Sequence, residues 1–203
     1  MNESCGGFVL PIPTEALTKL IERDAADLDL YADLSSEGTN VQGLTNFYPA
    51  RRPQVRIAAV LSELSSENRL RTTLTHEYGH VKFHDFLWQV EAHNPTMHEQ
   101  LSRQPSPKCK RDKIVGASEV DWMEWQAGYA SGSLLMPLSH VKAVVGTFCE
   151  THKLFAPIVV NSSAAHALMK VMVAAFRVST DAARVRLLKV GFLSERDLGP
   201  TLL

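Results

Sequence analysis

Apolar side chains in the first part of the chain predict one helix followed by a strand. From Leu17 to Leu28, after Pro13, they recur every three or four residues with charged residues between them, a spacing typical of an amphipathic helix. The segment SSEGTN and the stretch around Gly43 are expected to form turns. After Pro53, the run QVRIAAVL predicts a strand. Its edge could receive an extended peptide as an added strand.

A longer helix is predicted next, with Ser65 or Ser66 as its cap. The stretch HEYGH, residues 76–80, falls in the middle of this helix. The apolar residues expected to face the core are Leu70, Leu74, Val81 and Leu87.

Residues 89–118 interrupt the regular pattern, because they are polar, contain prolines and show no periodicity. They predict a long insertion loop. The following segment, SEVDWMEWQAGYASGSLLMP, predicts a helix capped by Ser118 and stopped by Pro137. Its many glycine, alanine and serine residues suit the close approach of another helix, although each glycine costs a helix about 1 kcal/mol relative to alanine.

Two or three further helices are predicted in the last part of the chain. Ser139, Asn161 or Ser162, and Ser179 are the expected caps, and Gly191 is expected to close the last helix. The residues expected on one face of the middle helix are Ala164, Leu168, Val171 and Ala175.

The segment from Met172 to Gly191 has the form of a helix-turn-helix, with a second helix that carries Arg184, Arg186 and Lys189. Asp181 on the same helix and the net charge of −1 argue against direct DNA binding and favour a packing unit. DNA binding stays open as an alternative.

Composition narrows the class of protein. The chain has 203 residues, 45% of them hydrophobic, which fits one domain or one domain with a small appendage. The near-zero net charge gives no overall attraction to nucleic acid or anionic membranes, and no apolar run is long enough to span a bilayer. The N-terminus has no basic flank, and the three cysteines are far apart. We therefore expect a cytoplasmic protein without disulfides.

The histidines of HEYGH have the spacing of a metal site. His76 and His80 lie four residues apart, so both imidazoles leave one face of a helix and can bind the same ion. Glu77 lies about 100° further round the helix. From there its carboxylate can accept a proton from water without occupying a coordination position. A chance occurrence of the pattern in a helix is the alternative.

A catalytic zinc site needs a third protein ligand. His84 lies on the same helix but has drifted by about 80° relative to His76, so we expect it to support the ligands or contact substrate. Glu124, among small residues, is the better candidate if its helix packs close across Gly79. The competing role for Glu124 is helix capping, since Asp121 and Glu124 have capping-box spacing.

Three segments resemble the signature blocks of the ImmA/IrrE family of metallo-endopeptidases: RLRTTLTHEYGHVKFH, EWQAGYASGSLLMP and FRVSTDAARVRLLKVGFL. VLPIPTEAL and QVRIAAV extend the resemblance over most of the chain. It implies an α+β, mostly helical zincin-like fold with a small antiparallel or mixed sheet. The metallopeptidase domain would span residues 1–138, and a helix-turn-helix-like segment, 139–203, would pack on it.

The resemblance also implies roles for individual residues. His76 and His80 fall on the family's histidine ligands, Glu77 on its catalytic glutamate and Glu124 on its glutamate ligand. Gly128 stands where the family often has asparagine. Zinc is the expected ion, and Mn²⁺ is compatible with the ligand types. The implied activity is hydrolysis of a peptide bond in a protein substrate. That substrate would be a helix-turn-helix repressor encoded nearby, at a mobile-element or stress-response locus.

Several assignments stay open. A non-proteolytic anti-repressor or a DNA-binding regulator that keeps its metal site is the alternative function. Tyr129 and Asp121, like His84, are expected to support the ligands or contact substrate. Tyr129, His84 and Tyr48 are candidates to stabilise an oxyanion. Cys109 in the insertion is either a thiolate that reaches the open metal position or an incidental thiol.

Overall fold

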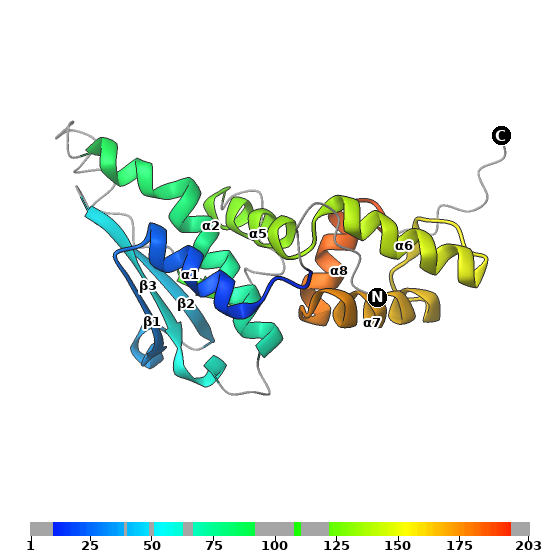
Figure 1. Cartoon of the computed structure of the whole chain (residues 1–203), viewed down its shortest axis with the longest axis horizontal. Coiled ribbons are helices and arrows are strands. Elements are labelled where there is room, and N and C mark those ends of the chain that lie inside the picture. The colour runs from blue at the N-terminus through cyan, green and yellow to red at the C-terminus, as the bar shows by residue number, and fades with distance from the viewer. Residues whose placement is uncertain are drawn as a thin grey trace. The chain divides into compact units, whose positions relative to one another are not determined.

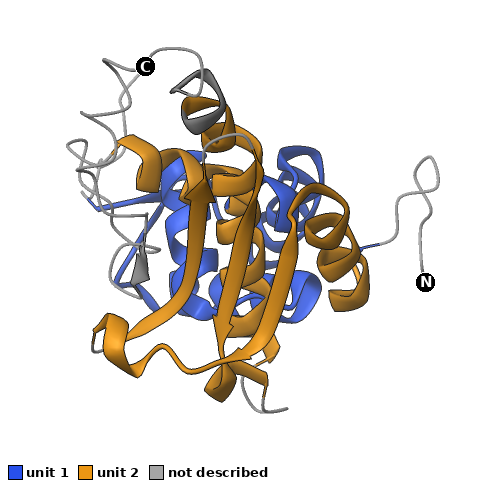
Figure 2. Ribbon diagram, turned by 90° about the vertical axis from the view of Figure 1, so that its left-hand side faces the viewer, with its two compact units in different colours: residues 1–11, 132–203 blue, residues 12–131 orange. Residues whose placement is uncertain are grey.

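The computed structural model describes residues 10–38, 40–48, 51–62, 67–91, 108–110 and 122–195. They form a mixed helix-and-strand protein (Figure 1). The chain divides into two compact units, residues 12–131 and residues 132–203 together with the N-terminal residues up to Pro11 (Figure 2). This boundary falls within a helix, earlier in the chain than residue 138. The helices and strands are α1 (Thr14–Asp24), β1 (Asp27–Ala32), β2 (Val41–Tyr48), β3 (Arg51–Ala58), α2 (Glu67–Glu91), β4 (Lys108–Lys110), α5 (Trp122–Leu135), α6 (Leu138–His152), β5 (Ile158–Val159), α7 (Ser163–Phe176), α8 (Thr180–Lys189) and β6 (Leu193–Ser194), with short 3-10 turns at Ser35–Glu37 and Ala59–Ser62.

The larger unit contains a four-stranded mixed sheet in the order β1-β3-β2-β4. β1 is parallel to β3, whereas β2 is antiparallel to both β3 and β4. The strand predicted after Pro53 is confirmed as β3. The expectation that its edge is open is wrong, because β1 and β2 pair with its two sides.

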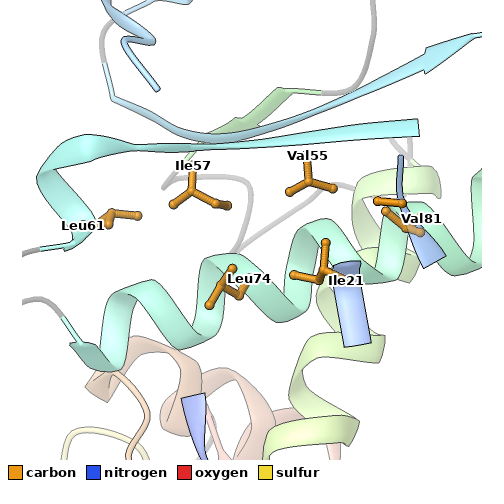
Figure 3. Packing of buried hydrophobic residues seen from close by; sticks show 7 residues of the cluster. Ile21, Val55, Ile57, Leu61, Leu74 and Val81 are labelled. Atoms are coloured by element: carbon orange, nitrogen blue, oxygen red, sulfur yellow. The ribbon is translucent and has the colours of Figure 1, made fainter. Parts of the chain in front are cut away.

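The core of this unit lies between the sheet and two helices. Leu74 and Val81 of α2 and Ile21 of α1 meet Val55 and Ile57 of β3 (Figure 3). All five side chains are at most 4% exposed, and burial of each contributes about 1.5–3 kcal/mol. The predicted inward face of α2 is confirmed for Leu74 and Val81, and Leu70 is partly buried against the same cluster. Leu87, predicted on this face, is only half-buried and is not part of the cluster.

The first helix is shorter than predicted. α1 ends at Asp24, and Ala25 already has extended backbone angles, φ −93 and ψ 165. Leu28, predicted to continue the helix, lies in β1 and pairs with Val55 of β3. The first four residues of β1, DLDL, alternate between polar and apolar, and the parallel pairing with β3 overrides the helical spacing of Leu28.

The unit that contains residues 132–203, here called the helical unit, carries α6, α7 and α8. Two of the three caps predicted for these helices are observed. Ser162 and Ser179 begin α7 and α8, and each accepts a hydrogen bond from a backbone N–H at 3.1 Å. Ser139 does not cap α6, which begins at Leu138 after Pro137. Val171, predicted to face inward, is 40% exposed, because the buried face of α7 is shifted by one residue. That face is formed by Ala165, Leu168, Met169, Met172 and Phe176.

The candidate DNA-contacting arginines are engaged inside the helical unit. Arg186 is 5% exposed. Its Nε donates to the Met136 carbonyl at 3.1 Å, and its Nη1 donates to Ser133 Oγ at 3.1 Å. Arg184 lies 3.8 Å from the Glu195 carboxylate. A buried guanidinium that bonds its own unit is unavailable to a phosphate, so α8 offers less positive charge than its sequence indicates.

Candidate metal centre

The two histidines of HEYGH lie on α2, on the side turned from the core. Both side chains are fully buried, and the Nε2 atoms of His76 and His80 lie 3.2 Å apart. The helical spacing therefore places both imidazoles at one point, as the sequence pattern predicts.

Glu124 completes the group from α5. Its Oε2 lies 3.2 Å from His76 Nε2 and its Oε1 lies 3.4 Å from His80 Nε2, and the side chain is 2% exposed. The three residues could hold a metal ion. A tetrahedral zinc site with metal–ligand distances of about 2.0–2.1 Å has ligands separated by about 3.3 Å. The observed spacing fits that geometry without rearrangement.

The pKa values of His80 and Glu124 favour metal binding. Burial lowers the pKa of His80 to about 4, and the neighbouring His76 acts in the same direction. Burial alone would raise the pKa of Glu124. The neighbouring side chains of His76 and His80 outweigh burial and hold the pKa of Glu124 well below its usual range. A neutral imidazole and an ionised carboxylate are the forms that bind a metal.

His84 and Gln126 orient the imidazole of His80. His84 is 2% exposed, and its Nε2 donates to Gln126 Oε1 at 3.0 Å. Nδ1 of the neutral His84 ring therefore accepts a hydrogen bond from Nδ1 of His80 at 2.9 Å. With its proton on Nδ1, His80 presents the lone pair of Nε2 to the other two ligands.

The close contact between α2 and α5 depends on small side chains. A Cβ atom on Gly79 would lie 2.9 Å from the Ala127 Cα and 3.1 Å from its carbonyl oxygen. One turn away, Thr75 Oγ1 and Ser131 Oγ share a hydrogen bond of 2.7 Å. The glycine thus allows α5 to come near enough for Glu124 to reach the histidines, as the sequence predicts.

Alanine substitutions at two helical glycines should therefore have opposite effects. Gly79→Ala should lower the free energy of unfolding by about 1–3 kcal/mol, because Ala127 backbone atoms must move. A Cβ atom on Gly146, in α6, would meet no neighbouring atom within 4 Å, so Gly146→Ala should raise it by about 0.5–1 kcal/mol. Urea denaturation measures both, and equal effects at the two sites would contradict the close contact.

Glu77 lies against strand β2 and outside the group of three. Its carboxylate accepts a 2.6 Å hydrogen bond from Thr45 Oγ1, and the side chain is fully buried. A Cβ atom on Gly43 would lie 2.6 Å from Glu77 Oε1. The expectation of a turn around Gly43 is wrong, because Gly43 lies within β2. A glycine in a strand often marks such a close approach.

Among the described residues, neither Tyr129 nor Tyr48 belongs to the metal group. Tyr129 is 45% exposed and stacks on Trp125, and it lies about 140° round α5 from Glu124. The Tyr48 hydroxyl donates to Gln54 at 2.7 Å. Asp121 and the cap candidate Ser118 lie outside the described residues.

Two residues of the site, Thr45 and Gln126, have no sequence pattern that marks them. Each makes a hydrogen bond to another residue of the site: Thr45 bonds to Glu77, and Gln126 bonds to His84. Gly43 did carry a sign, because an isolated glycine beside the β-rich run LTNFY is compatible with a strand that another group approaches closely.

Comparison with known proteins identifies no relative from which a function could be inferred. A scan against family models finds no match, and a search of curated proteins finds none. Among the described helices, none has the length and apolar character needed to cross a membrane. Function is therefore inferred from the metal group and the residues around it.

Proposed function

We propose that this chain is a zinc-dependent endopeptidase with a zincin-like fold, of the kind that its ImmA/IrrE-like segments indicate. The observation that carries the proposal is the convergence of His76, His80 and Glu124, all buried and within 3.2–3.4 Å of one another. Glu77 is the residue after His76 on α2, and its carboxylate bonds to Thr45 of β2. Three ligands and a separate carboxylate are the parts that metal-assisted hydrolysis requires.

The residues divide the chemistry between them. His76, His80 and Glu124 would hold the ion, which when bound supplies Lewis-acid polarisation of the scissile carbonyl and of water. Glu77 accepts a proton from the attacking water as the oxygen–carbon bond forms. It then returns this proton to the amine as the carbon–nitrogen bond breaks. Thr45 holds the Glu77 carboxylate in place through its hydrogen bond at 2.6 Å.

The proposed substrate is a helix-turn-helix repressor encoded near this chain, whose cleavage would release a mobile-element or stress-response locus. This choice rests on the resemblance of HEYGH, EWQAGYASGSLLMP and the C-terminal helical segment to the ImmA/IrrE blocks. Direct DNA binding has less support, since Arg186 is buried and bonded to Met136 and Ser133.

Removal and return of metal test the proposal. Protein stripped with a chelator should not cleave the neighbouring repressor, and stoichiometric Zn²⁺ should restore cleavage, with new termini identified by mass spectrometry. The same assay with Mn²⁺ in place of Zn²⁺ shows which of the two ions supports cleavage. Stable binding of the repressor by metal-loaded protein without any cut would instead favour a non-proteolytic anti-repressor.

The Thr45→Val variant should slow turnover without loss of metal. Valine has the shape of threonine but cannot donate to Glu77, and a hydrogen bond to a charged group contributes about 1.5–3 kcal/mol. We expect kcat to fall about 10–100-fold with KM little changed, since free-energy differences of that size correspond to such factors. Thr45→Ser keeps the hydroxyl and should restore most of the rate; equal rates for the two variants would contradict this role.

A further inference from the structure

The insertion contributes one described strand, and this strand occupies a particular edge of the sheet. β4 pairs antiparallel with β2, with Cys109 opposite Gly43, Lys108 opposite Leu44 and Lys110 opposite Val41. On its other side β2 pairs with β3, and β4 is the last strand in the order β1-β3-β2-β4. Without β4, the backbone of β2 would be an open edge, to which an extended chain can add.

This edge is the one nearest the candidate catalytic residues. Gly43, which pairs with Cys109, is also the residue that lies directly against the Glu77 carboxylate. β4 itself comes into contact with α2, the helix that carries His76 and His80. A chain paired with β2 therefore lies about 4.8 Å from Gly43, the usual spacing of strands. Its residue at the Cys109 position is the one nearest Glu77.

We propose that Lys108–Lys110 is an internal occupant of the peptide-binding edge, and that a substrate must displace it before cleavage. The proposal rests on the proposed peptidase function and adds a regulatory step to it. An extended peptide needs the same backbone N–H and C=O groups of β2 that β4 now uses. The two chains cannot pair there together, so β4 lowers the apparent affinity for every substrate.

The pairing is suited to displacement. β4 is three residues long, whereas independent strands usually have five or six. Its register with β2 is also irregular between Val41 and Gly43. A short, irregular pairing can open without disturbing the core between β3 and α2. If the edge is open about a tenth of the time, the apparent affinity for a peptide falls about tenfold.

The first experiment measures occupancy of the edge without any cleavage, in the Glu77→Gln background. Neighbouring residues of a strand turn their N–H groups to opposite sides. Changing both Lys108 and Cys109 to proline therefore removes at least one N–H that pairs with β2, whether residue 109 or residues 108 and 110 face that strand. Lys108→Ala with Cys109→Ala is the matched control, because it removes the same side chains and keeps both N–H groups. The probe is a fluorescein-labelled peptide of residues 104–114 with alanine in place of the cysteine.

We expect the proline variant to bind this peptide at least about tenfold more tightly than the alanine variant, as relief of internal competition requires. Hydrogen exchange at residues 41–44 should be faster in the free proline variant and should slow when the peptide binds. Equal affinities, or equal exchange at residues 41–44 in the two variants, would overturn the proposal. Circular dichroism and metal content of both variants establish that they are folded.

The second experiment restores Glu77 and follows cleavage of quenched fluorescent casein. The proline variant should have a lower KM than the alanine variant with a similar kcat. If both variants cleave casein faster than the wild-type protein and to the same extent, the side chains of Lys108 and Cys109 restrain the enzyme. Strand pairing would then not be the restraint, and the proposal would be overturned. If peptide binding behaves as expected but neither variant cleaves casein or the repressor, the peptidase function fails while the occupied edge stands.

Discussion

The Glu77→Gln variant is expected to keep its metal and to cleave about 10²–10⁴-fold more slowly, the usual contribution of a general base. Glutamine has the size of glutamate, and its amide oxygen can accept the 2.6 Å hydrogen bond that Thr45 donates. The fold and the three candidate metal ligands are therefore expected to be preserved. The amide, however, cannot accept the proton of the attacking water. Initial rates and zinc content, measured on the same preparation, test both parts of this prediction.

A matched substitution separates loss of the base from a general effect of removing an acidic group. Glu150 is exposed on α6, so Glu150→Gln should cleave at the wild-type rate and bind the same amount of zinc. A Glu77→Gln variant that retained both its metal and the wild-type rate would show that another group accepts the proton.

The part of the candidate metal centre that lies on one helix could be predicted from the sequence. His76 and His80 need only the helical period to meet at one point, and their Nε2 atoms lie 3.2 Å apart. Glu124 belongs to another helix, so its position depends on packing. Gly79 and the small residues of α5 indicate that packing in the sequence itself, because only small side chains allow two helices to come so close.

Contacts made by the sheet were harder to predict, because strand pairing joins residues that are distant in sequence. Leu28 fits the helical spacing that begins at Leu17, and only the pairing of β1 with β3 assigns it to a strand. Gly43 disfavours a strand by its intrinsic propensity, yet the Glu77 carboxylate leaves no room there for a larger residue. The sequence shows neither β3 nor Glu77 beside these positions.

The same reason explains why the sequence predicts an open edge at the wrong strand. QVRIAAV is a β-rich run, and such a run predicts a strand without showing its neighbours. In the sheet this run is interior, and the edge near Glu77 belongs to β2. Its partner, β4, comes from an insertion whose polar and aperiodic sequence predicts a loop.

Replacement of Glu124 should have the largest effect on metal content. Glu124→Ala leaves two histidines where a zinc site needs three protein ligands. We expect zinc affinity to fall by more than about 100-fold, since removal of residues that merely support ligands already costs about 10–100-fold. Elemental analysis after dialysis against a weak chelator measures the loss, and Glu150→Ala on exposed α6 provides the control.

Thermal unfolding adds a measurement that does not depend on catalysis. An ion that binds the folded chain stabilises it by RT ln(1 + [L]/Kd), so added zinc should raise the Tm of the wild-type protein and of Glu150→Ala. It should not raise the Tm of Glu124→Ala. Glu124→Gln keeps the size of the side chain and offers a neutral oxygen, so its response should be intermediate. If Glu124→Ala bound zinc as tightly as the wild-type protein, the carboxylate that lies 3.2 Å from His76 and 3.4 Å from His80 would be their hydrogen-bond partner and not a metal ligand.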